Sequence, residues 1–327
     1  MPFPAEDRNV PSNLSHKGHF SMTSILTNDA AMSALQTLRS INNNLEDTQN
    51  RVSSGYRVAK ASDNAAYWSI ATTMRSDNSA LSAVSDALGL GAAKVDTAYT
   101  AMDNSINVVQ QIKDKLVAAT ENSVDKADVQ EEISQLQQQL ESIAQSASFS
   151  GQNWMIGANG ASASVVSSFV RNNDGTVAVN STSYTFDSGS QGNVMFGANA
   201  DGTIDTSSGI LGTTQDINGT DYSVFSLNIT DMTSGDIAKS MNLVQSALNA
   251  MTSTASQLGS LSTRIDLQTS FVSTLSDTID SGVGKLVDAN MEEESSKLSA
   301  LQTQQQLAIQ SLQIANNSAQ NVLALFK

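Results

Sequence analysis

Residues 70–119 read IATTMRSDNSALSAVSDALGLGAAKVDTAYTAMDNSINVVQQIKDKLVAA, and their apolar side chains recur at alternating steps of three and four residues. This spacing is typical of a helix buried along one stripe, and a stripe of about seven heptads predicts a coiled-coil-like rod rather than an ordinary globular helix. Only Asp77, Gly91 and Ser105 interrupt it. The stripe consists of Ile70, Met74, Leu81, Val84, Leu88, Val95, Ala98, Met102, Val109, Ile112, Leu116 and Ala119.

A shorter helical pattern precedes this stretch. Apolar side chains between residues 35 and 52 follow the same spacing and predict a helix that stops at Gly55, since glycine suits the left-handed end of a helix. We expect Ser62 or Asp63 to cap the next helix, because either side chain can accept a hydrogen bond from the free amides of a first turn. The N-terminal arm is thus a short helix, a break and the long helix.

Another helix follows the long stretch. Residues 129–147 repeat the three-and-four spacing, and Gln137 is among the polar residues expected on its outer faces. The polar residues 121–128 predict the turn of an antiparallel pair formed by these two helices.

Between residues 155 and 235 the helical spacing disappears. Glycine and aspartate are frequent there, and Arg171 is the only basic residue. Short stretches of β-favouring residues alternate with turn residues, so we expect a small, acidic, solvent-facing β domain. Its expected strands are 164–170, 176–186, 193–196 and 222–229.

Helical spacing returns after residue 235, with stripes over 237–286 and 298–326 that mirror the first half, so we expect the two chain ends to pack together. The predicted fold is mainly α with a β insertion. The N- and C-terminal arms form a long antiparallel coiled-coil-like helical bundle, with a small outward β domain at its far tip. The predicted domains are an extension or mis-assigned start at 1–21 (with Met22 as the start), a terminal helical inner-core domain at 22–65 and 284–327, a helical rod domain at 66–154 and 236–283, and a variable outer β domain at 155–235.

Composition excludes many functional classes. The chain has no Cys, and every His and Pro precedes Phe20, which leaves few parts for nucleophilic or zinc chemistry. We therefore expect no enzyme activity, no catalytic or metal site and no cofactor. A net charge of −15 opposes binding to nucleic acid, and no apolar run is long enough for membrane insertion. The N-terminus also lacks the apolar segment of a Sec-type signal.

Each chain end carries an apolar stripe that little else in the chain can cover. Such a stripe is a liability in a soluble monomer, whereas a neighbouring copy would bury it. We therefore predict a self-assembly interface that becomes ordered as copies associate. Arg51, Arg57 and Lys60 could bind phosphate, but ion pairs with acidic residues of neighbouring subunits fit the acidic C-terminal cluster better. The predicted interface residues are Leu35, Leu38, Ile41, Leu45, Arg51, Val52, Arg57, Leu301, Leu312, Val322, Leu323, Leu325 and Phe326.

Two segments resemble the signatures of a known family. Residues 45–74, LEDTQNRVSSGYRVAKASDNAAYWSIATTM, resemble the N-terminal signature of bacterial flagellins, and residues 51–57 match it position by position. Residues 289–327, ANMEEESSKLSALQTQQQLAIQSLQIANNSAQNVLALFK, are similar to the flagellin C-terminal signature in their acidic cluster, Gln-rich run and hydrophobic tail. The details resemble flagellins of the alphaproteobacterial, rhizobial type.

The resemblance implies a structural subunit that self-polymerises into the flagellar filament used for swimming motility, outside the cell and secreted without a Sec signal. The implied partners are further copies of the chain, related flagellins, the flagellar type III export apparatus, a secretion chaperone, the filament cap and hook-junction proteins. Two alternatives remain open. One is a hook-filament junction protein or a secreted coiled-coil adhesin, and the other is an enzyme in the central insertion, which the lack of His and Cys there disfavours.

Overall fold

The computed structural model describes residues 27–121, 123–172 and 176–324, with side chains as far as Asn317. These residues form two compact units. The first contains the chain up to Trp68 and from Leu286 onward, and the second is Ser69–Lys285. The extension predicted at 1–21 lies outside the described residues.

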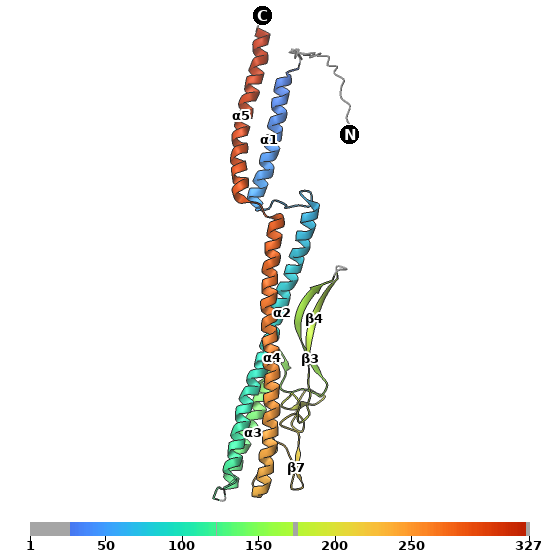
Figure 1. Cartoon of the computed structure of the whole chain (residues 1–327), viewed down its shortest axis with the longest axis vertical. Helices are drawn as coiled ribbons and strands as arrows, with labels where there is room; N and C mark the ends of the chain where they lie inside the picture. Colours follow the sequence, from blue (N-terminus) through green and yellow to red (C-terminus); the bar gives the residue numbers. More distant parts are fainter. Residues whose placement is uncertain (1–26, 122, 173–175, 325–327) are drawn as a thin grey trace, which may run out of the picture. The chain divides into compact units, whose positions relative to one another are not determined.

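The first unit is built on an antiparallel pair of helices from opposite ends of the chain, α1 (Asp29–Ser54) and α5 (Met291–Ala324) (Figure 1). Asn28 Nδ2 donates to the carbonyl of Ala315 at 2.9 Å, and Gln305 Nε2 donates to Asn42 Oδ1 at 2.7 Å. The prediction that the two chain ends pack together is confirmed.

The break between α1 and the next helix follows from local capping. Gly55 has a φ of 75° at the C-terminus of α1, and its N–H donates to the carbonyl of Arg51, as predicted for a left-handed helix end. The prediction that Ser62 or Asp63 caps the next helix is wrong. Asn64 Oδ1 accepts the Tyr67 N–H at 3.1 Å, whereas the Asp63 carboxylate accepts N–H groups of the preceding loop.

The second unit contains three long helices: α2 (Ala65–Ala118), α3 (Lys126–Ser146) and α4 (Ser234–Val287). From Leu81 onward the buried side chains of α2 follow the predicted stripe, whereas Ile70, the first residue of that stripe, is exposed. The predicted turn at 121–128 is too long by three residues, because α3 begins at Lys126. The side chains of Asn78 and Asp280 bond at 2.6 Å, so the start of α2 lies beside the end of α4.

Each break in the stripe of α2 has a structural reason. Ser105 is fully buried, and its hydroxyl donates to the Ala101 carbonyl one turn earlier. Gly91 is also buried, and the side chain of Val165 from the β segment occupies the space above it. Asp77 forms an ion pair with Arg171, the basic residue of the β segment. Two of the three breaks therefore mark where the insertion contacts the rod.

The β segment consists of four small antiparallel sheets of two strands each among the described residues. The longest hairpin, β3 (Ser162–Arg171) with β4 (Val177–Thr185), matches the first two predicted strands and has a bulge between Val166 and Ser168. The other pairs are β1 (Ser148–Phe149) with β2 (Gln152–Asn153), β5 (Gly197–Ala198) with β6 (Ile204–Asp205), and β7 (Gln215–Ile217) with β8 (Thr220–Tyr222).

The strand predicted at 193–196 is wrong, and of the strand predicted at 222–229 only Tyr222 lies in a strand, at the end of β8. Residues 193–196 and 223–229 are irregular chain whose apolar side chains are largely buried against the helices. The N–H of Met195, for example, donates to the Met155 carbonyl, and the N–H of Ile229 donates to Gln130 Oε1. A short apolar stretch in the sequence therefore does not by itself distinguish a strand from packed loop.

Glutamines of α3 hold this irregular chain in place. Gln137, predicted to face outward, is buried, and its amide donates to the carbonyls of Val224 and Leu227 at 3.0 and 3.1 Å. The segment shares one hydrophobic core with α2, α3 and α4. The expectation that it sits at the far tip of the bundle is also wrong, since β3 and β4 lie alongside α2 (Figure 1).

Candidate subunit interface

The apolar residues predicted for self-assembly fall into two groups within the terminal helix pair. Ile41 of α1 and Leu301 of α5 are buried, and Leu38, Leu45 and Leu312 are half-buried, so this stripe is covered largely by the pairing of α1 with α5 itself. Of the other predicted residues, Val52 is half-buried, Leu35 is exposed, the side chains of Val322 and Leu323 are outside the described part of α5, and Leu325 and Phe326 lie outside the described residues.

A second set of apolar side chains is uncovered on the same helix pair. Met32 of α1 is 60% exposed, and Leu307 and Ile314 of α5 are 58% and 69% exposed. A groove of about 690 Å³ lies between the two helices, and its lining consists of Leu307, Ile41, Gln304 and otherwise small side chains. Sequence reasoning missed Leu307 and Ile314 because they lie off the three-and-four stripe of the last helix; the signal was that α5 is apolar on more than one face.

Side chains of the motif at residues 51–57 tie the end of α1 to the start of α5. Arg51 Nη1 donates to Glu294 Oε1 at 3.3 Å, and Glu294 is buried. Arg57 Nη2 donates to the Leu286 carbonyl at 3.0 Å. Both arginines of the predicted interface therefore make contacts inside their own chain.

The backbone of the same motif closes the connection. Tyr56 and Asp288 form an antiparallel bridge, and the flanking backbone groups exchange N–H···O bonds of 2.7 and 2.9 Å. Val58 and Val287, which flank the bridge, are buried. The two chain arms are thus joined by a short β connection where α1 ends and α5 begins.

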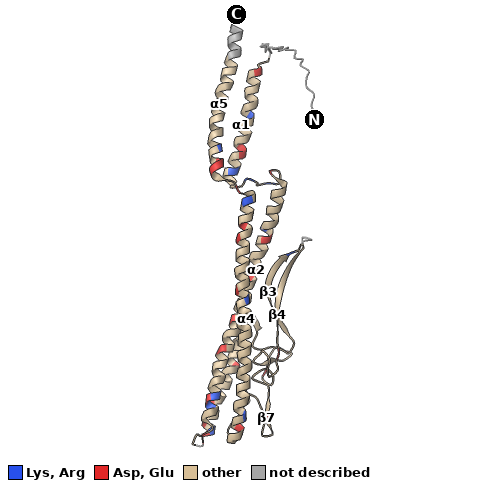
Figure 2. Cartoon of the chain, viewed as in Figure 1, with Lys and Arg blue, Asp and Glu red and all other residues tan. Residues whose placement is uncertain are grey.

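The first turn of α5 carries the acidic cluster Glu292, Glu293 and Glu294. Asn290 Oδ1 accepts the N–H of Glu292 at 3.2 Å, in the manner of a helix N-cap. Carboxylates at a helix N-terminus are stabilised by the helix dipole. Glu292 and Glu293 are exposed, whereas Glu294 turns toward Arg51. Figure 2 shows this acidic turn opposite the basic end of α1.

No group of three or more His, Cys, Asp or Glu side chains is placed to hold a metal ion in the part of the chain that the structure describes. Within the same residues, none of the helices combines the length and apolar character that crossing a membrane requires.

Paired chain ends, long helices and uncovered apolar side chains are features expected of a structural subunit that associates with further copies. Two family models match the chain: the bacterial flagellin N-terminal helical region over residues 25–160 and the bacterial flagellin C-terminal helical region over residues 241–326. The chain belongs to the bacterial flagellin family.

Individual relatives support this assignment over nearly the whole chain. Flagellin C of Rhizobium meliloti (strain 1021) is 51% identical, Flagellin A of Rhizobium meliloti is 47% identical, and the flagellin of Brucella melitensis biotype 1 is 43% identical. In each comparison the match covers 94% of this chain and 100% of the relative. The chain is accordingly a structural subunit that polymerises into the flagellar filament, outside the cell, in the service of motility. The comparisons do not favour a junction protein or an adhesin.

Proposed function

We propose that polymerisation runs through the terminal helix pair, with the uncovered apolar side chains of α1 and α5 as the surface buried between copies. The observation that supports this is the exposure of Met32, Leu307 and Ile314 on one helix pair. Leu307 and Ile314 are seven residues apart on α5 and so lie on one face of that helix. Neighbouring exposed apolar side chains of this kind mark sites of protein–protein contact. Complete burial of an exposed side chain of this size contributes about 1.5–3 kcal/mol, which offsets part of the entropy that a subunit loses when it joins a polymer.

The residues predicted from sequence take different roles in this proposal. Leu38, Ile41, Leu45, Leu301 and Leu312 hold α1 against α5 and so create the surface. Leu35, Val52, Val322, Leu323, Leu325 and Phe326 are proposed to contact neighbouring copies directly. Arg51 and Arg57 belong to the interface region as well. Arg51 orients α5 through its ion pair with Glu294, and Arg57 is proposed to contact an acidic residue of a neighbouring copy.

The export partners and the absence of enzyme activity are also part of the proposal. We propose that the chain leaves the cell through the flagellar type III apparatus with a secretion chaperone, and that it meets the filament cap and hook-junction proteins. Its sequence after Phe20 has no Cys and no His, which supports a purely structural role without a cofactor.

The test replaces exposed apolar residues without touching the core of the pair. Leu307→Ser with Ile314→Ser should abolish filaments in electron microscopy after seeding, because the surface loses its apolar contacts. The matched control is Gln306→Ser with Gln313→Ser, two exposed positions that immediately precede them on α5. Removal of residues 312–327 should likewise block filaments. Circular dichroism of the monomer should be the same for both double variants.

Normal filaments from the Leu307→Ser, Ile314→Ser chain would contradict the proposed surface. Equal loss of filaments in the glutamine control would also contradict it, since any change on α5 would then have the same effect.

A further inference from the structure

A pocket of about 370 Å³ lies beside the end of α1 in the first unit. It is formed by the last two turns of α1, the loop after Gly55 and the first turn of α2 as far as Tyr67. Its lining includes three basic side chains, Arg51, Arg57 and Lys60, and two acidic ones, Asp47 and Asp63.

The charges in this pocket are not equally available. The Asp63 carboxylate accepts the N–H groups of Lys60 and Ala59, and these bonds lower its pKa below the ordinary value. Arg51 is committed to Glu294. Arg57 uses one of its five N–H donors on a backbone carbonyl, and Lys60 forms no ion pair among the described residues. Arg57 and Lys60, both exposed, are thus the cations that can meet a further partner.

A complementary feature lies on α5 of the same unit. Glu292 and Glu293 are exposed, and neither takes part in an ion pair within the described part of the chain. Successive residues of a helix point about 100° apart, so a turn that directs Glu294 at Arg51 must direct its two neighbours elsewhere. Glu292 and Glu293 therefore point away from the end of α1 in their own chain.

The pocket and the acidic turn lie at the same level of the helix pair. Arg51 lines the pocket and also contacts Glu294, the residue directly after Glu293. A second copy placed alongside the first, with little shift along the helices, brings its acidic turn to the height of the pocket. A contact between two different patches need not close on itself, and it can continue into a helical polymer.

We propose that Arg57 and Lys60 of one copy bind Glu292 and Glu293 of the next copy, with the pocket beside α1 as the receptor and the first turn of α5 as its occupant. This inference rests on the polymerisation proposed above and names a specific polar contact within it. The occupant is a second copy because its Glu292 and Glu293 are opposite in charge to Arg57 and Lys60 and lie at the level of the pocket. The contact specifies which side of each subunit meets the next. Charge complementarity contributes more to this kind of specificity than to the affinity of an interface.

Charge reversal and mixing test the contact. Arg57→Glu with Lys60→Glu gives one variant, and Glu292→Lys with Glu293→Lys gives another. Each alone should raise the critical concentration for filaments at least tenfold, because like charges then face each other between copies. An equimolar mixture should recover filaments, since alternating copies place opposite charges at every contact. A chain with all four changes should also recover them.

The Arg51–Glu294 pair supplies the matched control, because it lies inside one chain. Arg51→Glu and Glu294→Arg should each weaken assembly, and their mixture should not recover it. Recovery requires both changes in one chain. The opposite patterns of recovery separate a contact between copies from a contact within a copy.

Cross-linking keeps the test decisive if a charge-reversed chain fails to fold. Filaments grown from a mixture of Lys60→Cys and Glu293→Cys chains should give a disulfide-linked heterodimer, and the natural chain has no Cys to interfere. If the heterodimer does not form, or if the mixture of charge-reversed chains forms filaments no better than either chain alone, the proposed contact is wrong. Either result is compatible with polymerisation of the wild-type chain. Filaments from the Leu307→Ser, Ile314→Ser chain would instead overturn the proposed function.

Discussion

Two glycines two residues apart in α2 show how much depends on a single Cβ atom. A Cβ built on Gly91 would lie closer than 3.0 Å to Val165 Cγ1, whereas one built on Gly89 would meet nothing within 4 Å. Val165 is itself buried on β3, and a β-branched side chain in a strand has few rotamers into which it can retreat. Gly91 therefore allows the β3–β4 hairpin to lie close against the rod.

Gly91→Ala should destabilise the second unit by about 1–3 kcal/mol, because the added methyl overpacks the contact with Val165. Gly89→Ala is the matched control and should stabilise the chain by up to about 1 kcal/mol through helix propensity. Denaturant unfolding followed by circular dichroism measures both. If the two variants unfold at the same midpoint, the close approach of the hairpin to α2 is not maintained in solution.

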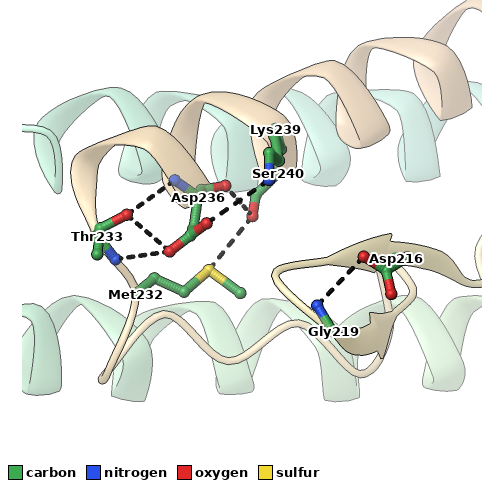
Figure 3. A network of polar contacts seen from close by, with 7 residues as sticks. All are labelled: Asp216, Gly219, Met232, Thr233, Asp236, Lys239 and Ser240. Atoms are coloured by element: carbon green, nitrogen blue, oxygen red, sulfur yellow. Dashed lines mark hydrogen bonds and ion pairs between the residues drawn. The ribbon is translucent and has the colours of Figure 1, made fainter.

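At the scale of elements, the start of α4 is fixed by reciprocal hydrogen bonds (Figure 3). Thr233 Oγ1 donates to Asp236 Oδ2 at 2.7 Å, and the backbone N–H of each residue bonds to the side chain of the other. This is the arrangement of a capping box, with Asp in place of the usual Glu. Ser240 is buried one turn later, and its hydroxyl contacts the sulfur of Met232. Lys126 of α3 donates to the Met232 carbonyl at 2.7 Å, so this cap also joins two helices.

The cap predicts an acid-sensitive contribution to stability. Hydrogen bonds from Thr233, helped by the charge of Lys239, hold the pKa of Asp236 below its ordinary value of 3.8. A lowered pKa in the folded state adds stability above the ordinary pKa, and that stability is lost as pH falls through the lowered value. The difference in Tm between wild type and Asp236→Asn should therefore be largest near neutral pH and shrink below about pH 4. Asp231→Asn, at an exposed position just before the cap, is the control. A difference that stays constant down to acid pH would contradict this role for the cap.

The helices could be predicted from the sequence because regular apolar spacing over many turns reflects the face of the helix that is buried. Gly55 likewise revealed the end of α1, since its left-handed backbone favours glycine. The irregular chain at 193–196 and 223–229 could not be predicted, because its order comes from distant partners such as Gln130 and Met155. The pairing of Arg171 with Asp77 was hidden for the same reason: two isolated charges 94 residues apart carry no local signal.

The candidate interface was predictable only in part. Sequence spacing located the apolar stripes that contain Ile41 and Leu301. Such spacing predicts that a side chain is buried, but it does not identify the element that buries it. In the structure, α1 and α5 bury much of those stripes by packing against each other, whereas Leu307 and Ile314 are exposed. The family motif at 51–57 was recognised as a pattern, whereas the contact of Arg51 with Glu294 depends on the fold.

At the scale of the whole molecule, the bridge between Tyr56 and Asp288 brings both arms of the chain together. The bond pattern around it is that of a non-hydrogen-bonded antiparallel pair, in which the two Cα atoms lie about 4.5 Å apart. This separation lies within the range that a disulfide spans.

Tyr56→Cys with Asp288→Cys should therefore form a disulfide within one chain. Oxidised monomer should migrate faster than reduced monomer in a denaturing gel, and the free energy of unfolding should rise by about 2–5 kcal/mol because the unfolded chain is closed into a long loop. The two single variants are the controls, since each can form only links between chains. Dimers without a fast-migrating monomer would place the two arms in different subunits.

The pairing of α1 with α5 also sets an order of folding. Its contacts join residues as far as 287 apart in sequence, and the entropy of closing a loop rises with its length. The second unit shortens this loop once it has folded, because Asn78 and Asp280 then lie side by side. We expect α1 and α5 to be the last elements to pair and the first to separate. Each newly arrived subunit would then complete its folding against the copies already in place, and the filament end would act as the template for that last step.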